Sequence, residues 1–520
     1  MNFYDLEPEQ QRRAAAARLF RYVRDYVAPY HPFLRRLYQK ERVDLRKLRT
    51  PDDVRRLPLI EKSHLQADPQ LFLLRPTVGG GPPLPEGYET APLRKSIALK
   101  YAAQAVLNYP RDSSALVRQP ALRERMRRRG LLEWQPIHYH VSTGSTGQPT
   151  PVMYTHYDFT HAVAELANLI TKSRGGAGNE IQFDWSDRVM NVFPGAPHVA
   201  FFAPVLAKAL AGISVFETFG SHVIPTDRQI AIFASGGFSS LTAVPSYLVY
   251  WLRRATVLLE EGKIAPLTKF KAVLVGAEPL SEALRQYLHT LARGLGADPR
   301  FTVYQTFGLT ELKWTCAECA EGSGMHLNPK YFYWELLHPE TREPVRPDEP
   351  GVLVFSHIGW RGTVLVRYWT GDLVKGGARW DRCARCGYMF PRVYAPICRV
   401  DQDFTKIKGT RVDLSLLIEI VRDTPGVRQF QVVLDRENPA DAFSRDLLTI
   451  HVAAEPGSSS GEIQHAVTQR VKASTEVSPD RVLFDQDEAA LEKLLFARTG
   501  IKAEYLVDRR ARNAAASVSS

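Results

Sequence analysis

A loop crowded with glycine and hydroxyl-bearing residues is the first feature of this chain that indicates chemistry. It lies within VSTGSTGQPTPVMYT, residues 141–155, between two segments of β-forming residues. Glycines let backbone N–H groups approach phosphate oxygens closely, and the hydroxyls add further donors. The loop is therefore a candidate cradle for a polyphosphate. Taken alone, an ordinary polar turn fits the same residues equally well.

A hydroxyl and a carboxylate follow a second β-prone run, VYQTFGLTELKW, residues 303–314. Thr310 and Glu311 come just after Gly308. At the carboxyl end of a parallel strand they would lie where α/β sheets bind ligands, and a carboxylate suits a hard cation such as Mg²⁺. The alternative is a plain strand exit with a helix-capping threonine.

A third candidate is the aromatic strand RYWTGDLV, residues 367–374, which reaches Asp372 just after Gly371. An aspartate in this setting can accept two hydrogen bonds from vicinal hydroxyls, as acidic residues do on a nucleotide ribose. A bare tripeptide of this kind is otherwise a turn.

Four of the five cysteines form two C-x-x-C pairs, which are Cys316 with Cys319 and Cys383 with Cys386. Two such pairs predict a tetrahedral Cys₄ zinc site, because each short turn supplies two thiolates. The pairs flank the two ligand-binding segments in sequence, so a structural Zn²⁺ would tie these segments together. Reduced free thiols are the alternative, and His326 and Cys398 are substitute ligands.

Length and charge bound the remaining possibilities. A chain of 520 residues exceeds what one hydrophobic core supports, so two or more domains are expected. No apolar run approaches the roughly 20 residues of a membrane-spanning helix, and the N-terminus resembles no targeting signal. The absence of both features predicts that the protein is cytoplasmic. The net charge of +11 suits polyphosphate ligands. The basic run 123–129 also fits a solvated face of a helix. The sequence shows no basic segment interleaved with aromatic residues of the kind that binds single-stranded nucleic acid.

The order of β-prone and helical segments predicts the elements that must position these residues. Between about 138 and 400 the two alternate, which favours an α/β domain with a largely parallel sheet. After residue 400 the pattern shortens to helix, strand, strand, helix and strand, a small α+β domain over 401–510. Residues 8–30 are predicted to form an amphipathic helix, 76–96 a Pro- and Gly-rich loop, and 511–520 a disordered tail.

Read in order, these motifs resemble those of adenylate-forming ligases. The series runs STGSTGQPT, TFGLTE, TGD, RVDQDFTKIKGTRVD (399–413) and TGIKAEYLVDRR (499–510). The N-terminal stretch from FRYVRDYV to PLIEKSHL, and GMHL followed by HPET, resemble the phenylacetate-CoA ligase family in particular. The likeness covers residues 17–75 and 138–510, whereas 76–137 has no clear counterpart. It implies a large N-terminal adenylate-forming domain, residues 1–400, with a small mobile C-terminal domain.

The resemblance also implies roles for individual residues. The phosphate loop would comprise Ser142, Thr143, Gly144, Ser145, Thr146 and Gly147. The adenine would contact Gly276, Ala277, Glu278 and Pro279, the nucleotide face Tyr304, Gln305 and Phe307, and the ribose Asp372 and Arg399. The catalytic set would be Glu311 on Mg²⁺, Thr310 on the α-phosphate, Lys502 bridging carboxylate and nucleotide, and His198 near the carboxylate pocket.

Several of these assignments have alternatives. His198 is as readily a packed histidine, and the candidate pocket walls Phe201, Phe202 and Tyr247 are as readily core residues. Gln148 stands where many of these ligases carry lysine, which removes one charge from the loop. The domain hinge is assigned to Asp401, and Gly409 would lie near the pantetheine channel.

The activity implied is ATP- and Mg²⁺-dependent conversion of a carboxylic acid, aromatic or otherwise apolar, to acyl-AMP, followed by transfer to coenzyme A. Two alternatives stay open. One is an adenylyltransferase of the F390 synthetase type, which passes AMP to a cofactor. The other is a zinc-containing interaction protein on a non-catalytic ligase scaffold. A homodimer is also left open.

Overall fold

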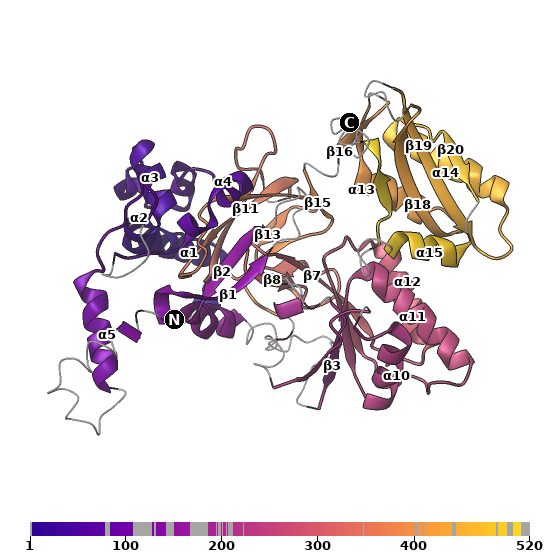
Figure 1. Cartoon of the computed structure of the whole chain (residues 1–520), viewed down its shortest axis with the longest axis horizontal. Helices are drawn as coiled ribbons and strands as arrows, with labels where there is room; N and C mark the ends of the chain where they lie inside the picture. Colours follow the sequence, from indigo (N-terminus) through magenta and orange to yellow (C-terminus); the bar gives the residue numbers. More distant parts are fainter. Residues whose placement is uncertain are drawn as a thin grey trace.

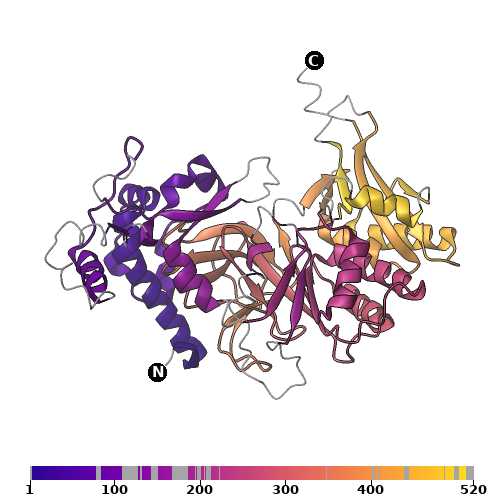
Figure 2. The ribbon, with the colours of Figure 1, turned by 60° about the horizontal axis from the view of Figure 1, so that its bottom comes forward.

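Three bodies follow one another in the computed structural model, as Figure 1 shows: N-terminal helices, central sheets and a C-terminal sheet flanked by helices. Seen from a second side, the central sheets again lie between the other two (Figure 2). None of the helices in the described part of the chain is both long and apolar enough to cross a bilayer. The structure describes residues 3–77, 84–107, 127–128, 130, 132–141, 150–166, 186–193, 195, 199, 201–203, 205, 212–221, 223–346, 348–400, 404–408, 410–438, 444–484, 487–496 and 503–510.

Short helices make up the N-terminal body. They are η1 (Phe3–Asp5), α1 (Pro8–Tyr22), η2 (Val23–Val27), α2 (Ala28–Tyr30), α3 (Pro32–Lys40), η3 (Leu45–Lys47), η4 (Pro51–Arg56), α4 (Lys62–Ala67), η5 (Pro69–Phe72) and α5 (Lys95–Leu107). The helix predicted over residues 8–30 is confirmed as α1, η2 and α2 in direct succession. The apolar residues that predicted it, such as Leu19 and Val27, are fully buried.

The central body combines a hairpin with two antiparallel sheets. The hairpin is β1 (Pro136–Val141) and β2 (Pro151–Thr155), followed by η6 (Asp158–Val163). The larger sheet has the order β10 (Phe332–Leu337), β11 (Gly351–His357), β12 (Tyr368–Val374), β15 (Ile397–Arg399), and the smaller one β13 (Ala378–Trp380), β14 (Pro391–Val393), β9 (Met325–His326). The N-terminal helices pack on them in one continuous core, which includes Phe20, Phe72 and Phe355.

A six-stranded sheet supplies the predicted parallel component. Its order is β4 (Ser214–Glu217), β3 (Arg188–Asn191), β5 (Ser240–Ala243), β6 (Ala272–Val275), β7 (Thr302–Leu309), β8 (Trp314–Ala317), and its helices are α10 (Thr226–Gly236), α11 (Pro245–Glu260) and α12 (Glu282–Gly294). Every pairing is parallel except β7 with β8. The carboxyl ends of β5, β6 and β7 therefore share one edge.

The C-terminal body has its own core. Its elements are β16 (Phe404–Ile407), β17 (Thr410–Asp413), α13 (Leu414–Arg422), β18 (Val427–Arg436), β19 (Asp446–Ala454), α14 (Ser460–Thr475), β20 (Arg481–Leu483), α15 (Glu488–Phe496) and β21 (Leu506–Asp508). The predicted series from α13 to β20 is confirmed, whereas the hairpin β16–β17, α15 and β21 were not predicted. The boundary at residue 400 and the mobility of this body stay predictions, and the predicted tail 511–520 lies outside the described residues.

One buried carboxylate joins three segments that are far apart in the chain. Asp158, at the start of η6, accepts hydrogen bonds from the backbone N–H groups of Thr155 (3.0 Å), Arg361 (2.7 Å) and Gly362 (2.9 Å). Its Oδ2 also lies 3.0 Å from Nζ of Lys313. Because both side chains of this ion pair are fully buried, water cannot replace either partner.

The lysine of this pair fixes the turn that follows β7. Its Nζ lies 4.6 Å from the ring centroid of Tyr154 and 4.5 Å from that of Trp360, so the ring faces also stabilise the cation. Burial lowers the pKa of Lys313, and the charge of Asp158 opposes that shift. The backbone of Lys313 has a φ of 67°, a conformation that side-chain-bearing residues adopt only when their surroundings impose it.

Asp158→Asn should lower the free energy of unfolding by about 3–5 kcal/mol, because it leaves the buried ammonium of Lys313 without a counter-charge. Urea unfolding followed by tryptophan fluorescence measures the change. Asp298→Asn is the matched control, since Asp298 also pairs with a cation, here Arg300, and accepts from a backbone N–H, but in a pair that is open to water. The control should cost about 1 kcal/mol or less, and equal losses in the two variants would contradict the role given to Asp158.

Candidate active site

The carboxyl end of β6 continues into the predicted adenine turn, Gly276–Pro279. A Cβ on Gly276 would lie 2.9 Å from the carbonyl oxygen of Thr306 on β7, so only glycine fits this close approach. Ala277 has a φ of 67°. The carboxylate of Glu278 accepts hydrogen bonds from the backbone N–H (3.0 Å) and hydroxyl (2.9 Å) of Ser246 at the start of α11. The turn is thus fixed against two neighbouring elements.

A buried acidic residue after β8 holds the adjacent strand β7. The carboxylate of Glu318 accepts hydrogen bonds from the backbone N–H of Gln305 (2.8 Å) and from the guanidinium of Arg285 at 3.1 and 3.2 Å. Gln305 is buried, while its predicted companions Tyr304 and Phe307 are half-buried on the same strand. β7 is therefore held next to the adenine turn by an ion pair that water does not reach.

The predicted magnesium ligand lies in the turn that follows β7. Glu311 is only 4% exposed, and its Oε1 lies 3.8 Å from Nζ of Lys62 and 3.5 Å from the hydroxyl of Tyr368 on β12. Burial raises the pKa of Tyr368, and the charge of Glu311 adds to this shift. Carboxylate oxygens are preferred ligands of hard divalent cations. Such a cation carries a larger charge than the ammonium of Lys62 and can take its place beside this oxygen. The neighbouring Thr310 is half-buried.

The predicted ribose-binding pair is joined across two strands. Asp372 on β12 and Arg399 on β15 face each other in the antiparallel register, and Nε of Arg399 lies 3.2 Å from Oδ1 of Asp372. The Asp372 backbone N–H donates to the hydroxyl of Thr370 at 3.0 Å. Strand β12 carries both Asp372 and Tyr368, the residue that Glu311 contacts, and these two strand residues are separated by the rise of four residues, about 13 Å. The structure thus brings three of the predicted motifs to one region.

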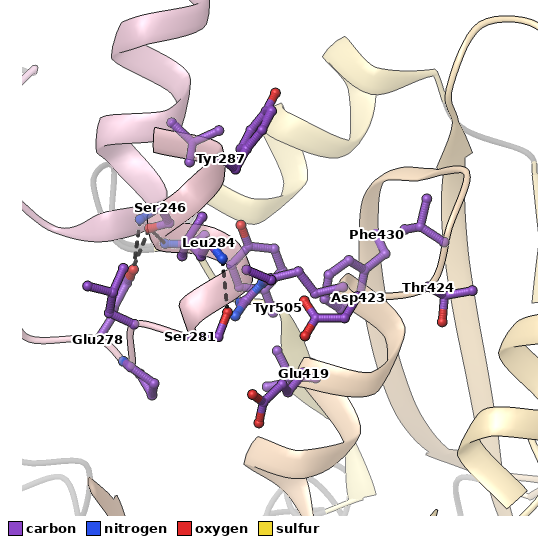
Figure 3. Close-up of a pocket in the computed structure, with 18 of the residues that line it drawn as sticks. Ser246, Glu278, Ser281, Leu284, Tyr287, Glu419, Asp423, Thr424, Phe430 and Tyr505 are labelled. Carbon is purple, nitrogen blue, oxygen red and sulfur yellow. Dashed lines mark hydrogen bonds between the residues drawn. The ribbon is translucent and has the colours of Figure 1, made fainter. Parts of the chain in front are cut away.

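A cavity of about 970 Å³ separates this edge from the C-terminal body. Figure 3 shows Ser246, Glu278 and Tyr287 on one side of it, and Glu419, Phe430 and Tyr505 on the other. The backbone N–H of Ala503 donates to the hydroxyl of Ser246 at 3.4 Å, so the C-terminal body contacts the start of α11, whose Ser246 in turn holds Glu278 of the adenine turn.

Several predicted site residues fall outside the described part of the chain and are not placed. These are the phosphate loop from Ser142 to Gly147 with Gln148, and the single residues His198, Asp401, Gly409 and Lys502.

Of the candidate pocket walls, Tyr247 packs in the core beside the parallel sheet, where burial raises its pKa to about 12. Phe201 lies 5.2 Å from Phe219 between ring centroids, and Phe202 stacks on His138 at 4.6 Å.

Two histidines on β1 were missed by the sequence reasoning. Nε2 of His138 lies 3.1 Å from Nε2 of His140, whose Nδ1 lies 3.0 Å from the hydroxyl of Tyr154. That hydroxyl donates to the carbonyl of Lys313 at 3.1 Å, so the chain of contacts reaches the turn of Glu311. Their alternation in PIHYHV was a visible signal. Lys62 carried no such signal, because its partner is 249 positions away.

The cysteines gather with one change from the predicted set. Cys319, Cys383 and Cys386 lie in one group with His326, and their ligand atoms are all within 4.8 Å of one another. Cys316 lies outside this group and packs in the central core, where burial raises the pKa of its thiol. The reason is the position of each cysteine relative to β8. Cys316 lies within this strand and its side chain is part of the core, whereas Cys319 lies beyond the end of the strand.

Comparison with known proteins gives a consistent result. Residues 99–365 match the family described as AMP-binding enzyme. The chain is 28% identical over 315 residues to a phenylacetate-coenzyme A ligase of Thermus thermophilus, covering 58% of this chain and 63% of that protein. A phenylacetate-coenzyme A ligase of Aromatoleum evansii is 25% identical over 394 residues, covering 71% and 78%.

Among solved structures, a 2-hydroxyisobutyryl-CoA ligase in the postadenylation state matches with a TM-score of 0.72 and 17% identity, covering 99% of this chain and 93% of that one. This likeness confirms the predicted fold class, a large α/β domain with a smaller C-terminal α+β domain.

Gly276→Ala should weaken ATP binding at least tenfold, or about 1.4 kcal/mol, because the added Cβ displaces the adenine turn from β7. Isothermal titration calorimetry with ATP gives the affinity. Gly294→Ala is the matched control, since a Cβ there would meet no described atom within 4 Å. Unchanged affinity in Gly276→Ala would contradict the assignment of this turn to the nucleotide.

Proposed function

This chain belongs to the AMP-binding enzyme family, and we propose that it joins a carboxylic acid to coenzyme A through an acyl-adenylate. The observation that carries the proposal is the convergence of three elements at one site. The Gly276–Pro279 turn, Glu311 and Asp372 lie around the carboxyl edge of the parallel sheet and the adjoining strand β12. Edges of this kind bind nucleotides in α/β folds.

The proposed reaction has two balanced steps. An oxygen of the carboxylate forms a bond to the α-phosphorus of ATP, and the bond from that phosphorus to pyrophosphate breaks. The sulfur of coenzyme A then forms a bond to the acyl carbon, its proton passes to solvent, and AMP leaves. The first step brings two anions together, so cations at the site must stabilise the developing charge.

Residues of the site are proposed to hold the nucleotide and the metal ion for this step. Asp372 would accept hydrogen bonds from the ribose hydroxyls while Arg399 keeps its carboxylate in place. Thr310 would donate to an α-phosphate oxygen. Glu311 would hold Mg²⁺, which supplies neutralisation of the phosphate charge when bound.

Lys502 is proposed to bridge the substrate carboxylate and the nucleotide. What supports this role is its neighbour Ala503, whose backbone N–H donates to Ser246 beside the adenine turn. A lysine on the C-terminal body can approach or leave the site as that body turns about residue 401.

The acid is proposed to be aromatic or otherwise apolar, and the acceptor to be coenzyme A. The relatives' names point to phenylacetate, and Phe202 stacks with His138 close to Phe159 in an aromatic cluster. The acceptor rests on the relatives' names, which are those of coenzyme A ligases. The cavity between the bodies does not decide it, because its cations Arg253, Lys375 and Arg428 are paired with carboxylates and Glu278, Glu419 and Asp423 line it as well. We also place the enzyme in the cytoplasm. No disulfide joins any of its five cysteines, which fits a reducing compartment.

ATP–pyrophosphate exchange, screened over aryl and fatty acids, tests the first step. Acid-dependent exchange is expected, with the highest rate for an aromatic or apolar acid. Addition of coenzyme A should then give an acyl-CoA detectable by mass spectrometry. AMP attached to a final product would instead identify an adenylyltransferase, and no exchange with any acid would contradict the proposed activity.

Lys502→Ala should lower the exchange rate by about 100-fold or more, as the loss of a charge at a reacting centre does, while the affinity for ATP changes little. Lys493→Ala, which removes an exposed lysine of α15, is the matched control and should keep the exchange rate. If Lys502→Ala retains full adenylation, the assigned role is wrong.

A further inference from the structure

Four side chains with soft donor atoms converge at a place that the proposed reaction does not use. The Sγ atoms of Cys319 and Cys383 are 3.6 Å apart, and Sγ of Cys386 lies 3.3 Å from Nε2 of His326. All four donor atoms lie within 4.8 Å of one another. The separations exclude a disulfide, in which the sulfurs would be about 2.05 Å apart.

The separations match the edges of a metal-centred tetrahedron. With Zn–S bonds of about 2.3 Å and a Zn–N bond of about 2.0 Å, tetrahedral angles place two sulfurs about 3.8 Å apart and a sulfur and a nitrogen about 3.5 Å apart. The S–S distance of 3.6 Å and the S–N distance of 3.3 Å differ from these lengths by about 0.2 Å. Thiolate and imidazole donors in a tetrahedral set favour zinc over hard cations such as Mg²⁺ or Ca²⁺.

Backbone geometry presents the donors independently of any metal. Cys383 and Cys386 lie in the turn between β13 and β14, where the N–H of Cys383 donates to the carbonyl of Tyr388 and the N–H of Gly387 donates to that of Cys383. Gly387 has a φ of 74°, which the turn needs in order to return past its cysteines. The turn is thus a knuckle in the form that zinc sites use.

The other two donors come from the loop after β8, which carries Cys319, and from strand β9, which carries His326. The Cys319 N–H donates to the hydroxyl of Ser323 at 3.1 Å. His326 ends β9 and faces Arg392 of β14 in the sheet register, so the sheet itself brings the imidazole to the knuckle. Cys383 and Cys386 are buried with Tyr388 and Phe390, which keeps bulk water from two of the thiols.

We propose that Cys319, His326, Cys383 and Cys386 bind one Zn²⁺ as a closed Cys₃His structural site. Binding displaces the thiol protons to solvent and leaves each sulfur as a thiolate bonded to the metal. The four protein ligands fill the coordination sphere, so no position is open for a substrate. The site is therefore structural and separate from the reaction at Glu311.

The position of the site gives it a defined task. Cys319 directly follows Glu318, whose carboxylate accepts hydrogen bonds from the N–H groups of Gln305 and Gly322. The metal would fix this loop to the knuckle between β13 and β14. It would thereby keep Glu318 against β7, the strand that leads to Glu311.

Metal analysis of matched variants tests the proposal. The full chain, produced in zinc-supplemented medium and purified without chelator or immobilised metal, should contain about one zinc per chain by plasma mass spectrometry. His326→Ala should retain zinc at least tenfold more weakly in competition with a chromophoric chelator. Cys316→Ala is the matched control, because Cys316 belongs to the nearest C-x-x-C pair but lies outside the group, and it should keep the metal.

A second measurement does not depend on variants that fold. Wild-type chain stripped of zinc and refilled with Co²⁺ should show the strong visible and near-ultraviolet absorption of a tetrahedral thiolate site. Folded wild-type chain without zinc, or a weak octahedral Co²⁺ spectrum, would overturn the proposal. Loss of zinc in Cys316→Ala with retention in His326→Ala would replace the proposed ligand set by the four cysteines.

Discussion

The buried ion pair of Asp158 and Lys313 is the interaction on which the arrangement of the site depends. Asp158 follows the hairpin whose loop is the predicted phosphate cradle, and Lys313 closes the turn that carries Glu311. The backbone N–H groups of Arg361 and Gly362, which the same carboxylate binds, lead into the strand of Asp372. A Cβ at Gly362 would lie 2.8 Å from this carboxylate and 2.1 Å from the carbonyl of Met153, so glycine alone lets the third segment approach. One charge thus sets the spacing of three motifs.

Around this pair, the site is assembled from short-range contacts at the edge of the sheet. Gly276 allows β6 to end against β7, and Glu318 holds β7 from the other side with help from Arg285. The contacts of Glu318 are buried and charge-assisted, which makes them stronger than neutral hydrogen bonds and leaves little room for β7 to shift. Rigid strand ends suit the proposed reaction, in which Lys502 of a C-terminal body proposed to be mobile arrives after the substrate.

The sequence predicted those parts of the structure whose signals are local. The apolar periodicity of residues 8–30 located a helix, and the run from VRQFQVVLDR to RVLFD located three strands and the helix between them, because periodicity depends only on near neighbours. The resemblance to adenylate-forming ligases implied that Asp372 and Arg399 share one site, whereas their pairing across β12 and β15 was not predicted. The Asp158–Lys313 pair was missed, because the sequence around each residue contains no signal for a partner 155 positions away.

The zinc ligands are a second case in which local sequence signals predicted a site but not its exact residues. The two C-x-x-C pairs predicted a metal, yet spacing alone could not reveal that Cys316 lies within a strand and packs in the core. His326 lies in the group because β9 pairs with β14. The register between two strands that are distant in the chain cannot be predicted from a single sequence. It was only one of two substitute ligands that the sequence suggested.

The central claim is that one nucleotide contacts the adenine turn, Glu311 and Asp372 together. A crystal structure of the chain with a non-hydrolysable acyl-sulfamoyl adenosine measures this directly. We expect the adenine to lie against Gly276–Pro279 and β7, the ribose hydroxyls to contact Asp372, and the sulfamoyl group to lie near Thr310. An analogue bound elsewhere, or bound without contact to Asp372, would contradict it.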